Sequence, residues 1–332
     1  MEAGPAVEEA RRRRGQFHLN LGAATGDVNK EIEGSVTNKD HLSPTPLFTA
    51  TDPFIIIHAY SELTGERLVD PIAKMKEAAR EGWSTFAPFE MTTGSVAPML
   101  VKFAGIHEGT RVLDVGCGTG VVALTAARVG AEVSGLDLTP ALLDRARENA
   151  TLAGLAIEFR EGDVEDLSFD DESFDYVVSQ FGHMFGPRPD IAIGEMLRVL
   201  KSGGIIAFST WPPDFFTGRL FKLIGGYAPP PPEGVSSPVA WGDPNVVRQR
   251  LGDAVADLAF DSGTMRHPAL SPVHLRLFME VNAGPVSRLV ESLADDAERL
   301  TRFRTELENL ISNYFDDNTV RQDFLMTRAT KI

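Results

Sequence analysis

The segment VLDVGCGTG at residues 112–120 constrains the fold more than any other part of the chain. An apolar run with one acid, Asp114, ends in three glycines at alternate positions, Gly116, Gly118 and Gly120. An Ala-rich stretch that is typical of a helix follows directly. This order predicts a buried strand, a tight glycine turn and the start of a helix. A turn of this kind allows a ligand to approach the backbone closely.

Strand and helix patterns alternate from this segment onward, as they do in a parallel α/β sheet. Strands are predicted at 111–115, 132–136, 156–160, 174–179 and 204–210. Helices are predicted between them at 119–129, 140–153 and 189–200. KSGG at 201–204 is expected to form the turn that ends the last of these helices. We therefore predict a doubly wound, Rossmann-like α/β sheet.

The regions on either side of this core are less regular. Residues 1–95 are expected to form an N-terminal arm and helical cap, and residues 96–332 the main domain. Within the first region the patterns predict a short helix at 5–14, a strand or buried helical turn at 53–60, and a helix at 69–81. A homodimer, if one forms, is expected to use this N-terminal region.

The chain after Trp211 continues with a proline-rich insert, residues 212–250, which we expect to act as a lid. Further elements are predicted as a helix at 96–105, helices at 218–225 and 243–251, a strand at 254–265, a helical region at 271–313 and a strand at 322–330. With the five strands above, the sheet is expected to contain seven strands.

Composition excludes several classes of function. A formal net charge of −15 disfavours general binding of DNA or RNA phosphates. The single cysteine, Cys117, rules out an intramolecular disulfide and a cysteine-rich zinc site, and the histidines show no metal-ligand spacing, so no metal site is expected. No apolar stretch approaches the ~20 residues of a membrane span, and a cytoplasmic protein is expected.

Three acids narrow the choice of ligand. Val121 occupies the position where the dinucleotide fingerprint G-x-G-x-x-G needs its third glycine. Asp114 would repel a pyrophosphate. Asp137 lies 21 residues after Gly116, where an acid reaches ribose hydroxyls in such sheets, and Asp163 follows the third strand. These acids favour a nucleoside without phosphates, and a positive charge on that nucleoside would be attracted.

The ordered motifs resemble those of the class I S-adenosylmethionine-dependent methyltransferases. VLDVGCGTG is similar to their first motif, GLDLTP to the ribose-binding segment and EGDVEDLSF to the adenine-binding turn. FDYVVSQFGHMF and MLRVLKSGGIIAFST are similar to the motifs that follow, and FLMTRAT to the last, antiparallel strand. The resemblance covers roughly 96–211 and is nearest to the ubiquinone/menaquinone C-methyltransferase-like branch of small-molecule enzymes.

This resemblance implies roles for the residues of the first motif and the ribose segment. Gly116, Gly118 and Gly120 would let the backbone approach the methionine part of S-adenosylmethionine. Asp114 would steady that loop and help to hold the amino group, and Asp137 would bind both ribose hydroxyls.

The same resemblance assigns the adenine and methionyl ends of the cofactor. Asp163 would accept a hydrogen bond from the adenine amino group, with Leu138 and Val164 flanking the ring. Leu138 and Val164 could equally be core residues. Gln180, after the fourth strand, would face the methionyl end.

The acceptor side is less determined by sequence. His183 is the candidate general base, and its alternative is a histidine that is hydrogen-bonded in a loop. The aromatic residues before the first motif and after the fifth strand would close over the cofactor or line the acceptor pocket, or would simply pack in the core: Trp83, Phe86, Phe89, Trp211, Phe215 and Phe216.

The resulting prediction is a methyltransferase that transfers a methyl group in line to a small, largely apolar acceptor. A catalytically silent cofactor-binding or scaffolding protein is the main alternative. A nicotinamide-dependent oxidoreductase and an RNA methyltransferase are disfavoured, the first by Val121 and the acids, the second by the net charge.

Overall fold

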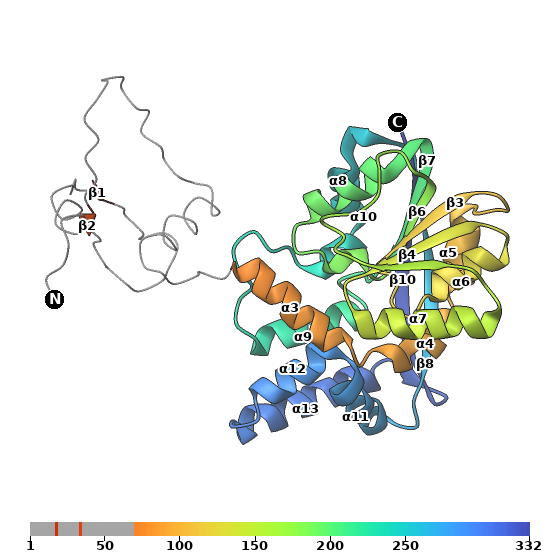
Figure 1. Ribbon diagram of the computed structural model, residues 1–332. Helices are drawn as coiled ribbons and strands as arrows, with labels where there is room; N and C mark the ends of the chain where they lie inside the picture. Colours follow the sequence, from red (N-terminus) through yellow and green to blue (C-terminus); the bar gives the residue numbers. More distant parts are fainter. Residues whose placement is uncertain (1–16, 19–32, 35–69) are drawn as a thin grey trace, which may run out of the picture. The chain divides into compact units, whose positions relative to one another are not determined.

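The computed structural model describes residues 70–332 and two short strands, Phe17–His18 (β1) and Glu33–Gly34 (β2), which pair antiparallel (Figure 1). Contacts divide the chain into two units, Met1–Arg67 and Leu68–Ile332. The second unit carries the site described below. The helix expected at 5–14, the apolar segment at 53–60 and most of the expected dimer contact lie outside the described residues.

A mixed sheet forms the centre of the second unit. Its parallel strands are β3 (Arg111–Val115), β4 (Glu132–Asp137), β5 (Glu158–Glu161), β6 (Phe174–Gln180) and β7 (Leu200–Thr210). The order β5-β4-β3-β6-β7-β10-β8 places β10 (Thr319–Lys331) between β7 and β8 (Val255–Pro268), antiparallel to both. The two-residue β9 (Phe315–Asp316) also pairs with β10. The predicted sheet with an antiparallel last strand is confirmed.

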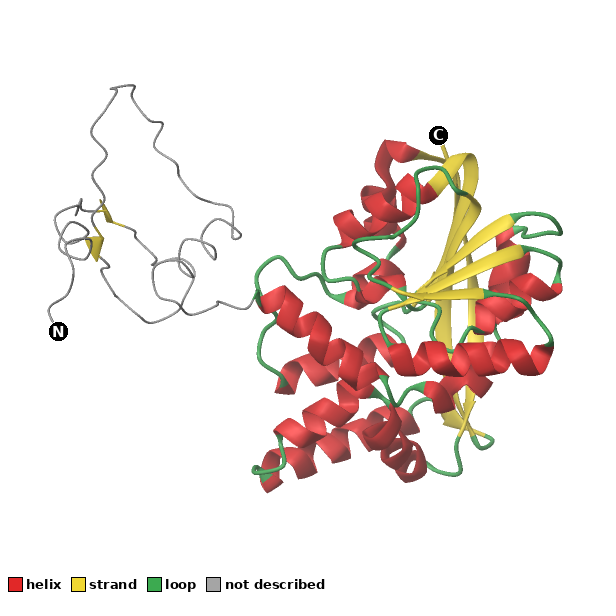
Figure 2. Ribbon diagram, in the orientation of Figure 1, coloured by secondary structure: helices red, strands yellow, loops and turns green. Residues whose placement is uncertain are grey.

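Both faces of the sheet are covered by helices, as Figure 2 shows. Neighbouring residues of one strand enter different cores because side chains alternate across a sheet. Val112 packs with α5 (Ala97–Ala104), α6 (Val121–Arg128) and α7 (Pro140–Ala153), whereas Leu113 packs with α8 (Pro189–Val199) and α10 (Pro244–Leu251). The apolar runs of the central strands therefore reflect burial on both faces.

The turn expected at 201–204 takes a different form. Strand β7 already begins at Leu200, opposite Phe174 of β6, and the next pair is Tyr176 with Ile205. The residues KSGG are therefore accommodated as an irregularity within the strand pairing, with Gly203 at φ 75°. A glycine in the left-handed region allows the chain to bend there without steric cost.

A helical cap packs beside the sheet and is assembled from separate parts of the sequence. It consists of α3 (Pro71–Trp83), α9 (Phe216–Tyr227), α11 (Pro272–Asn282), α12 (Gly284–Ser292) and α13 (Ala297–Ser312). The helical region expected at 271–313 is thus three helices. A Cβ on Gly284 would lie 2.3 Å from the backbone oxygen of Gly82, so α3 and α12 meet backbone to backbone.

Contacts place helix α3, the 3-10 turn η1 (Ala87–Phe89) and α4 (Glu90–Gly94) in the same compact unit as the sheet. The division expected after residue 95 therefore differs from the observed division after Arg67. The reason is that these short elements pack on the rest of this unit, α3 on α12, η1 on α11 and α4 on β8.

The insert 212–250 divides into two parts, and only the first belongs to the cap. Helix α9 packs on α12 and α13, while η3 (Pro238–Gly242) and α10 pack beside α8 and η2 (His183–Phe185). Trp241, Val247 and Leu251 are buried in the core of the sheet. The second half of the insert, ending at η4 (Gly252–Ala254), is therefore structural and does not form a lid. Within residues 70–332, every helix is too short or too polar to cross a lipid bilayer.

Candidate active site

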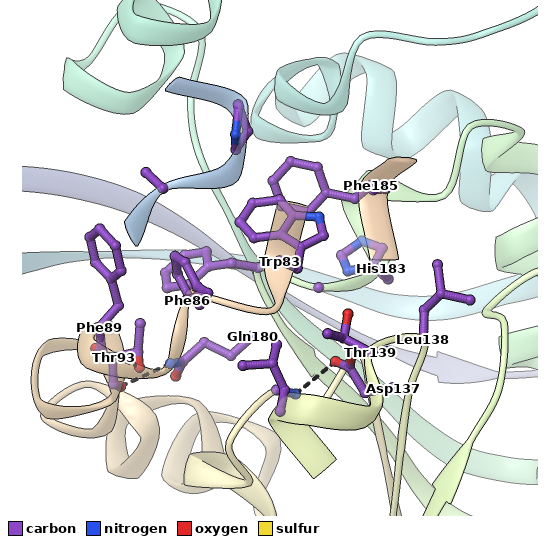
Figure 3. A pocket seen from close by; sticks show the side chains of 18 of the residues that line it. Trp83, Phe86, Phe89, Thr93, Asp137, Leu138, Thr139, Gln180, His183 and Phe185 are labelled. Atoms are coloured by element: carbon purple, nitrogen blue, oxygen red, sulfur yellow. Dashed lines mark hydrogen bonds between the residues drawn. The ribbon is translucent and has the colours of Figure 1, made fainter. Parts of the chain in front are cut away.

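A cavity lies between the carboxyl ends of β3, β4 and β6 and the helical cap (Figure 3). Its lining comes from the loops after these strands and from α3, α9, α11 and α12. Open α/β sheets bind their ligands at this edge. The cavity is therefore the candidate site.

The glycine turn presents one open backbone position to the cavity. A Cβ on Gly118 would meet no other atom within 4 Å, whereas a Cβ on Gly116 would lie 2.8 Å from the Cα of Gly182. A Cβ on Gly120 would lie 2.8 Å from Leu124 Cδ1, and Gly120 does not line the cavity. Gly118 is thus free for a ligand, while Gly116 and Gly120 allow close packing of the turn.

Asp137 supports the same turn from the end of β4. Its Oδ2 accepts a hydrogen bond from the Gly118 amide at 2.8 Å, and its Oδ1 accepts one from the Thr139 amide at 2.9 Å. Burial raises the pKa of this carboxyl group, and the backbone hydrogen bonds act in the opposite direction. Each oxygen retains a further lone pair toward the cavity that the residue lines.

Asp114 does not line the cavity. It is fully buried, and its Oδ2 accepts a hydrogen bond from the Ala123 amide at 3.0 Å, in the first turn of α6. Its Oδ1 has no partner among the described residues. Burial raises the pKa of this carboxyl group to about 8. Asp114 therefore links strand β3 to helix α6 behind the turn, and a direct contact with a ligand is not open to it.

The turn after β5 carries Asp163 and a group of charges that the sequence analysis missed. Lys76 Nζ of α3 lies 2.5 Å from Asp163 Oδ2 and 2.5 Å from Glu165 Oε2. Arg188 Nη2 lies 2.7 Å from the same Glu165 oxygen. Arg80, one helical turn after Lys76, pairs with Glu161 at 2.6 Å. The sequence did contain a signal for these ion pairs, since the predicted helix 69–81 carries two basic residues one turn apart.

Leu138 and Val164 both line the cavity and are only partly buried. They therefore present apolar surface to the space between the two turns. The sequence left open whether these residues face a ligand or belong to the core. Their exposure to the cavity favours the first alternative. A flat ring would fit against such side chains.

Gln180 leaves an unsatisfied acceptor at the cavity. Its Nε2 donates a hydrogen bond to the backbone oxygen of Thr93 at 2.9 Å, drawn in Figure 3, and its Oε1 is buried without a partner in the part of the chain that is described. An unmade buried hydrogen bond costs about 1–3 kcal/mol. A ligand N–H group at this position would satisfy it.

Four aromatic rings form a continuous row along the cavity, which we call the aromatic wall: Phe185, Trp83, Phe86 and Phe89. The successive ring centroids are 4.8, 5.2 and 4.5 Å apart. The sequence analysis named three of these residues and missed Phe185, which is contributed by the loop after β6. Such faces attract cations.

A second aromatic pair lies at the end of β7. The rings of Phe181 and Trp211 stack with centroids 3.8 Å apart, and both residues line the cavity. Phe181 has φ 63°, a left-handed conformation that is costly for a bulky residue and is concentrated at functional sites. Phe215 is 42% exposed and lies outside the lining, whereas the adjacent Phe216 is buried and lines the cavity. Phe215 precedes α9 in extended conformation, and its side chain is exposed, whereas Phe216 begins the helix and is buried.

His183 does not present a nitrogen to the cavity. Both ring nitrogens are buried without a partner among the described residues, and the ring packs against Phe208 and Trp241. Burial lowers the pKa of this histidine to about 3, and the charge of Arg250 acts in the same direction. A neutral ring with no exposed nitrogen is poorly suited to take a proton from an acceptor, so the geometry does not favour the predicted base.

Comparisons with known proteins agree with the motifs. The family described as "Methyltransferase domain" matches residues 113–208. An uncharacterized protein of Mycobacterium tuberculosis is 35% identical over 237 residues, which cover 71% of this chain and 86% of that protein. A demethylmenaquinone methyltransferase of Staphylococcus aureus is 40% identical over 111 residues, 32% of this chain and 45% of the relative.

The chain belongs to the class I S-adenosylmethionine-dependent methyltransferases. Among solved structures, the fold is similar to that of phosphoethanolamine N-methyltransferase 2 of Haemonchus contortus, with a TM-score of 0.45 and 18% identity over 71% of this chain and 52% of that one.

The cap side of this methyltransferase lies outside the matched family region, and of its lining residues the sequence analysis named only Phe216, within the insert expected to act as a lid. Its lining residues run from α9 to β10, and we call them the acceptor half: Phe216, Thr217, Leu220, Phe221, Ile224, Met265, Leu275, Met279, Ala283, Pro285, Val286 and Gln322. Only Thr217 and Gln322 in this set are polar, and the set contains no charged side chain. The charged side chains among the described lining residues come from other elements, namely α3, α4 and the carboxyl ends of β4 and β5: Lys76, Glu90, Asp137 and Asp163.

Proposed function

We propose that the protein transfers a methyl group from S-adenosylmethionine to a small, largely apolar acceptor. The observation that carries this proposal is the division of one cavity into two chemically different parts. Carboxylates, backbone amides and the Gln180 acceptor surround the end at the sheet edge. The acceptor half at the cap is almost entirely apolar.

The residues at the sheet edge fit the methyl donor. Because Gly118 has no side chain and open space beside it, a ligand can approach its backbone closely. Asp137 offers carboxylate lone pairs to the vicinal hydroxyls of a ribose. The buried, unpaired Gln180 Oε1 would accept from an ammonium group. Leu138 and Val164 would flank an adenine ring beside Asp163. These residues would hold the cofactor without a phosphate-binding cation.

S-adenosylmethionine, when bound, supplies a methyl group on a positively charged sulfur, so that an acceptor displaces a neutral thioether. The chain aligns and shields the reacting groups. The aromatic wall would lie beside the cation and exclude water, and the stacked Phe181 and Trp211 would bound the acceptor. Transfer in line requires the acceptor atom to approach the methyl group from the side opposite the sulfur.

Among the lining residues that the structure describes, no carboxylate, lysine or histidine is free to act as a general base. Lys76 is paired with Asp163 and Glu165, and Glu90 is paired with Arg145. Asp137 accepts two backbone hydrogen bonds, and the nitrogens of His183 are buried. We therefore infer that the acceptor reacts without a protein base, either through an atom that carries no proton or after losing its proton to solvent.

Calorimetric titration of the full chain with S-adenosylmethionine and S-adenosylhomocysteine tests the cofactor. Asp137→Asn should weaken binding of both by at least about tenfold, since bonds to a charged group contribute about 1.5–3 kcal/mol each. Asp144→Asn, an exposed acid on α7, is the matched control. Absence of binding to the wild-type chain would overturn the proposal. Binding without formation of S-adenosylhomocysteine across a broad panel of apolar acceptors would favour a silent cofactor-binding protein.

A further inference from the structure

We propose that the side chain of Gln322 recognises one hydroxyl or carbonyl group on an otherwise apolar, uncharged acceptor. This inference rests on the proposed function, because it concerns the acceptor half of the same cavity. It adds a specificity-determining residue that lies outside every methyltransferase motif of the chain.

The position of Gln322 in strand β10 places it where two cores meet. Val320, Gln322 and Phe324 are alternate residues and so share one face of the strand. Val320 is buried in the core of the cap, and Phe324 is buried in the core of the sheet. The ring of Phe324 lies 5.7 Å from Phe181, one of the stacked pair beside the cavity. Gln322 is therefore the residue of β10 that the cavity reaches.

The amide of Gln322 has unused hydrogen-bonding capacity. The residue is 8% exposed, lines the cavity and pairs across the sheet with Met265, another lining residue. No hydrogen bond joins its side chain to any of residues 70–332. The amide atoms are also not sealed from solvent, so they face open space at the cavity and can bind a ligand group there.

The surroundings define the class of ligand. Apart from Gln322 and Thr217, every member of the acceptor half is apolar. A charged acceptor would therefore lose its hydration there without gaining a charged partner. An amide offers two N–H donors and one carbonyl acceptor. It can therefore bind either a hydroxyl or a carbonyl group. The expected acceptor is a neutral molecule with a large apolar body and one such group.

A matched pair of probes tests the inference on the full chain saturated with S-adenosylhomocysteine. Affinities for 2-naphthol and naphthalene are measured by calorimetry. The wild-type chain should bind the naphthol more tightly by about tenfold, the size expected for one buried neutral hydrogen bond. Gln322→Met, which keeps the length of the side chain, should reduce this preference to less than about twofold.

Two controls separate the possible failures. Gln249→Met changes an exposed glutamine on α10 and should leave the preference at its wild-type value. Circular dichroism and the affinity for S-adenosylhomocysteine check that Gln322→Met is folded. If the wild-type chain binds neither probe, binds both equally, or if Gln322→Met retains the preference, the role of Gln322 is wrong. Failure to bind S-adenosylhomocysteine instead contradicts the proposed function, and the probe preference can then still be measured on the chain alone.

Discussion

Lys76 Nζ lies 2.5 Å from Asp163 Oδ2, which joins helix α3 of the cap to the turn after β5. The same ammonium group lies 2.5 Å from Glu165, whose side chain is 1% exposed. A segment that precedes the first methyltransferase motif is thereby attached to the turn after β5. Because α3 also contributes Trp83 to the aromatic wall, this attachment fixes the position of α3 along the cavity.

Replacement of Lys76 by methionine should destabilise the protein by about 1–2 kcal/mol. Among residues 70–332, the change leaves the buried Glu165 with Arg188 as its single charged partner, and an incompletely paired buried carboxylate is costly. Lys74→Met, an exposed lysine of the same helix, should have little effect. Urea unfolding of the two variants checks this expectation, and equal stabilities would show that the Lys76 contacts contribute nothing.

The central sheet was predictable because each of its strands is marked by a pattern within a few neighbouring residues. Strand β3 (Arg111–Val115) is mostly apolar and buried on both faces, and Gly116 directly after it marks its carboxyl end. The cap was not predictable in the same way, because α3, α9 and α11 to α13 are separated by long stretches of sequence. Each of these helices shows an apolar face, but no local signal indicates which other face covers it.

The errors made for individual residues have the same cause, because the burial of a side chain depends on contacts that are distant in sequence. Phe215 and Phe216 are chemically identical, and only the start of α9 decides which ring is buried. The position of His183 after β6 was correct, but nothing local showed that its ring packs against Phe208 with both nitrogens buried. Gln322 could have been noticed as a polar residue in the buried register of β10 between Val320 and Phe324.

Asp114 should make stability depend on pH between about 4 and 8. Its folded pKa of about 8 lies above the value near 3.9 of an unfolded aspartate, so only the folded state holds the proton in this range. Stability should therefore fall as pH rises, by up to about 1.4 kcal/mol per pH unit. Asp114→Asn cannot ionise, and the free energy of unfolding of wild type relative to this variant should decrease between pH 5 and pH 8. A constant difference, measured by urea unfolding, would contradict the assignment.

His183 should remain neutral throughout the physiological pH range. Its folded pKa of about 3 lies below the ordinary value of 6.5, so it stabilises the fold above pH 6.5 and loses that contribution as pH falls toward 3. NMR of the histidine Cε1–H groups, assigned with His183→Leu, should show no titration of this ring between pH 5 and pH 8. A midpoint near 6 to 7 would instead support the general-base role.

Trp83 should discriminate between the methyl donor and its product. The product lacks the positive charge on sulfur, so a cation–π contribution from the aromatic wall stabilises only the donor. Trp83→Leu removes one ring from the wall while retaining an apolar side chain against Phe86 and Phe185. The affinity for S-adenosylmethionine should then fall about 2- to 30-fold more than the affinity for S-adenosylhomocysteine, which corresponds to about 0.5–2 kcal/mol.

The comparison of two ligands on one variant makes this measurement independent of general damage to the cap. Loss of packing around α3 would weaken both ligands by the same factor and leave their ratio unchanged. A ratio equal to that of the wild-type chain would therefore mean that Trp83 only packs against its neighbours. Leu152→Ala, an exposed apolar residue on α7 outside this cavity, provides the reference for changes unrelated to the wall.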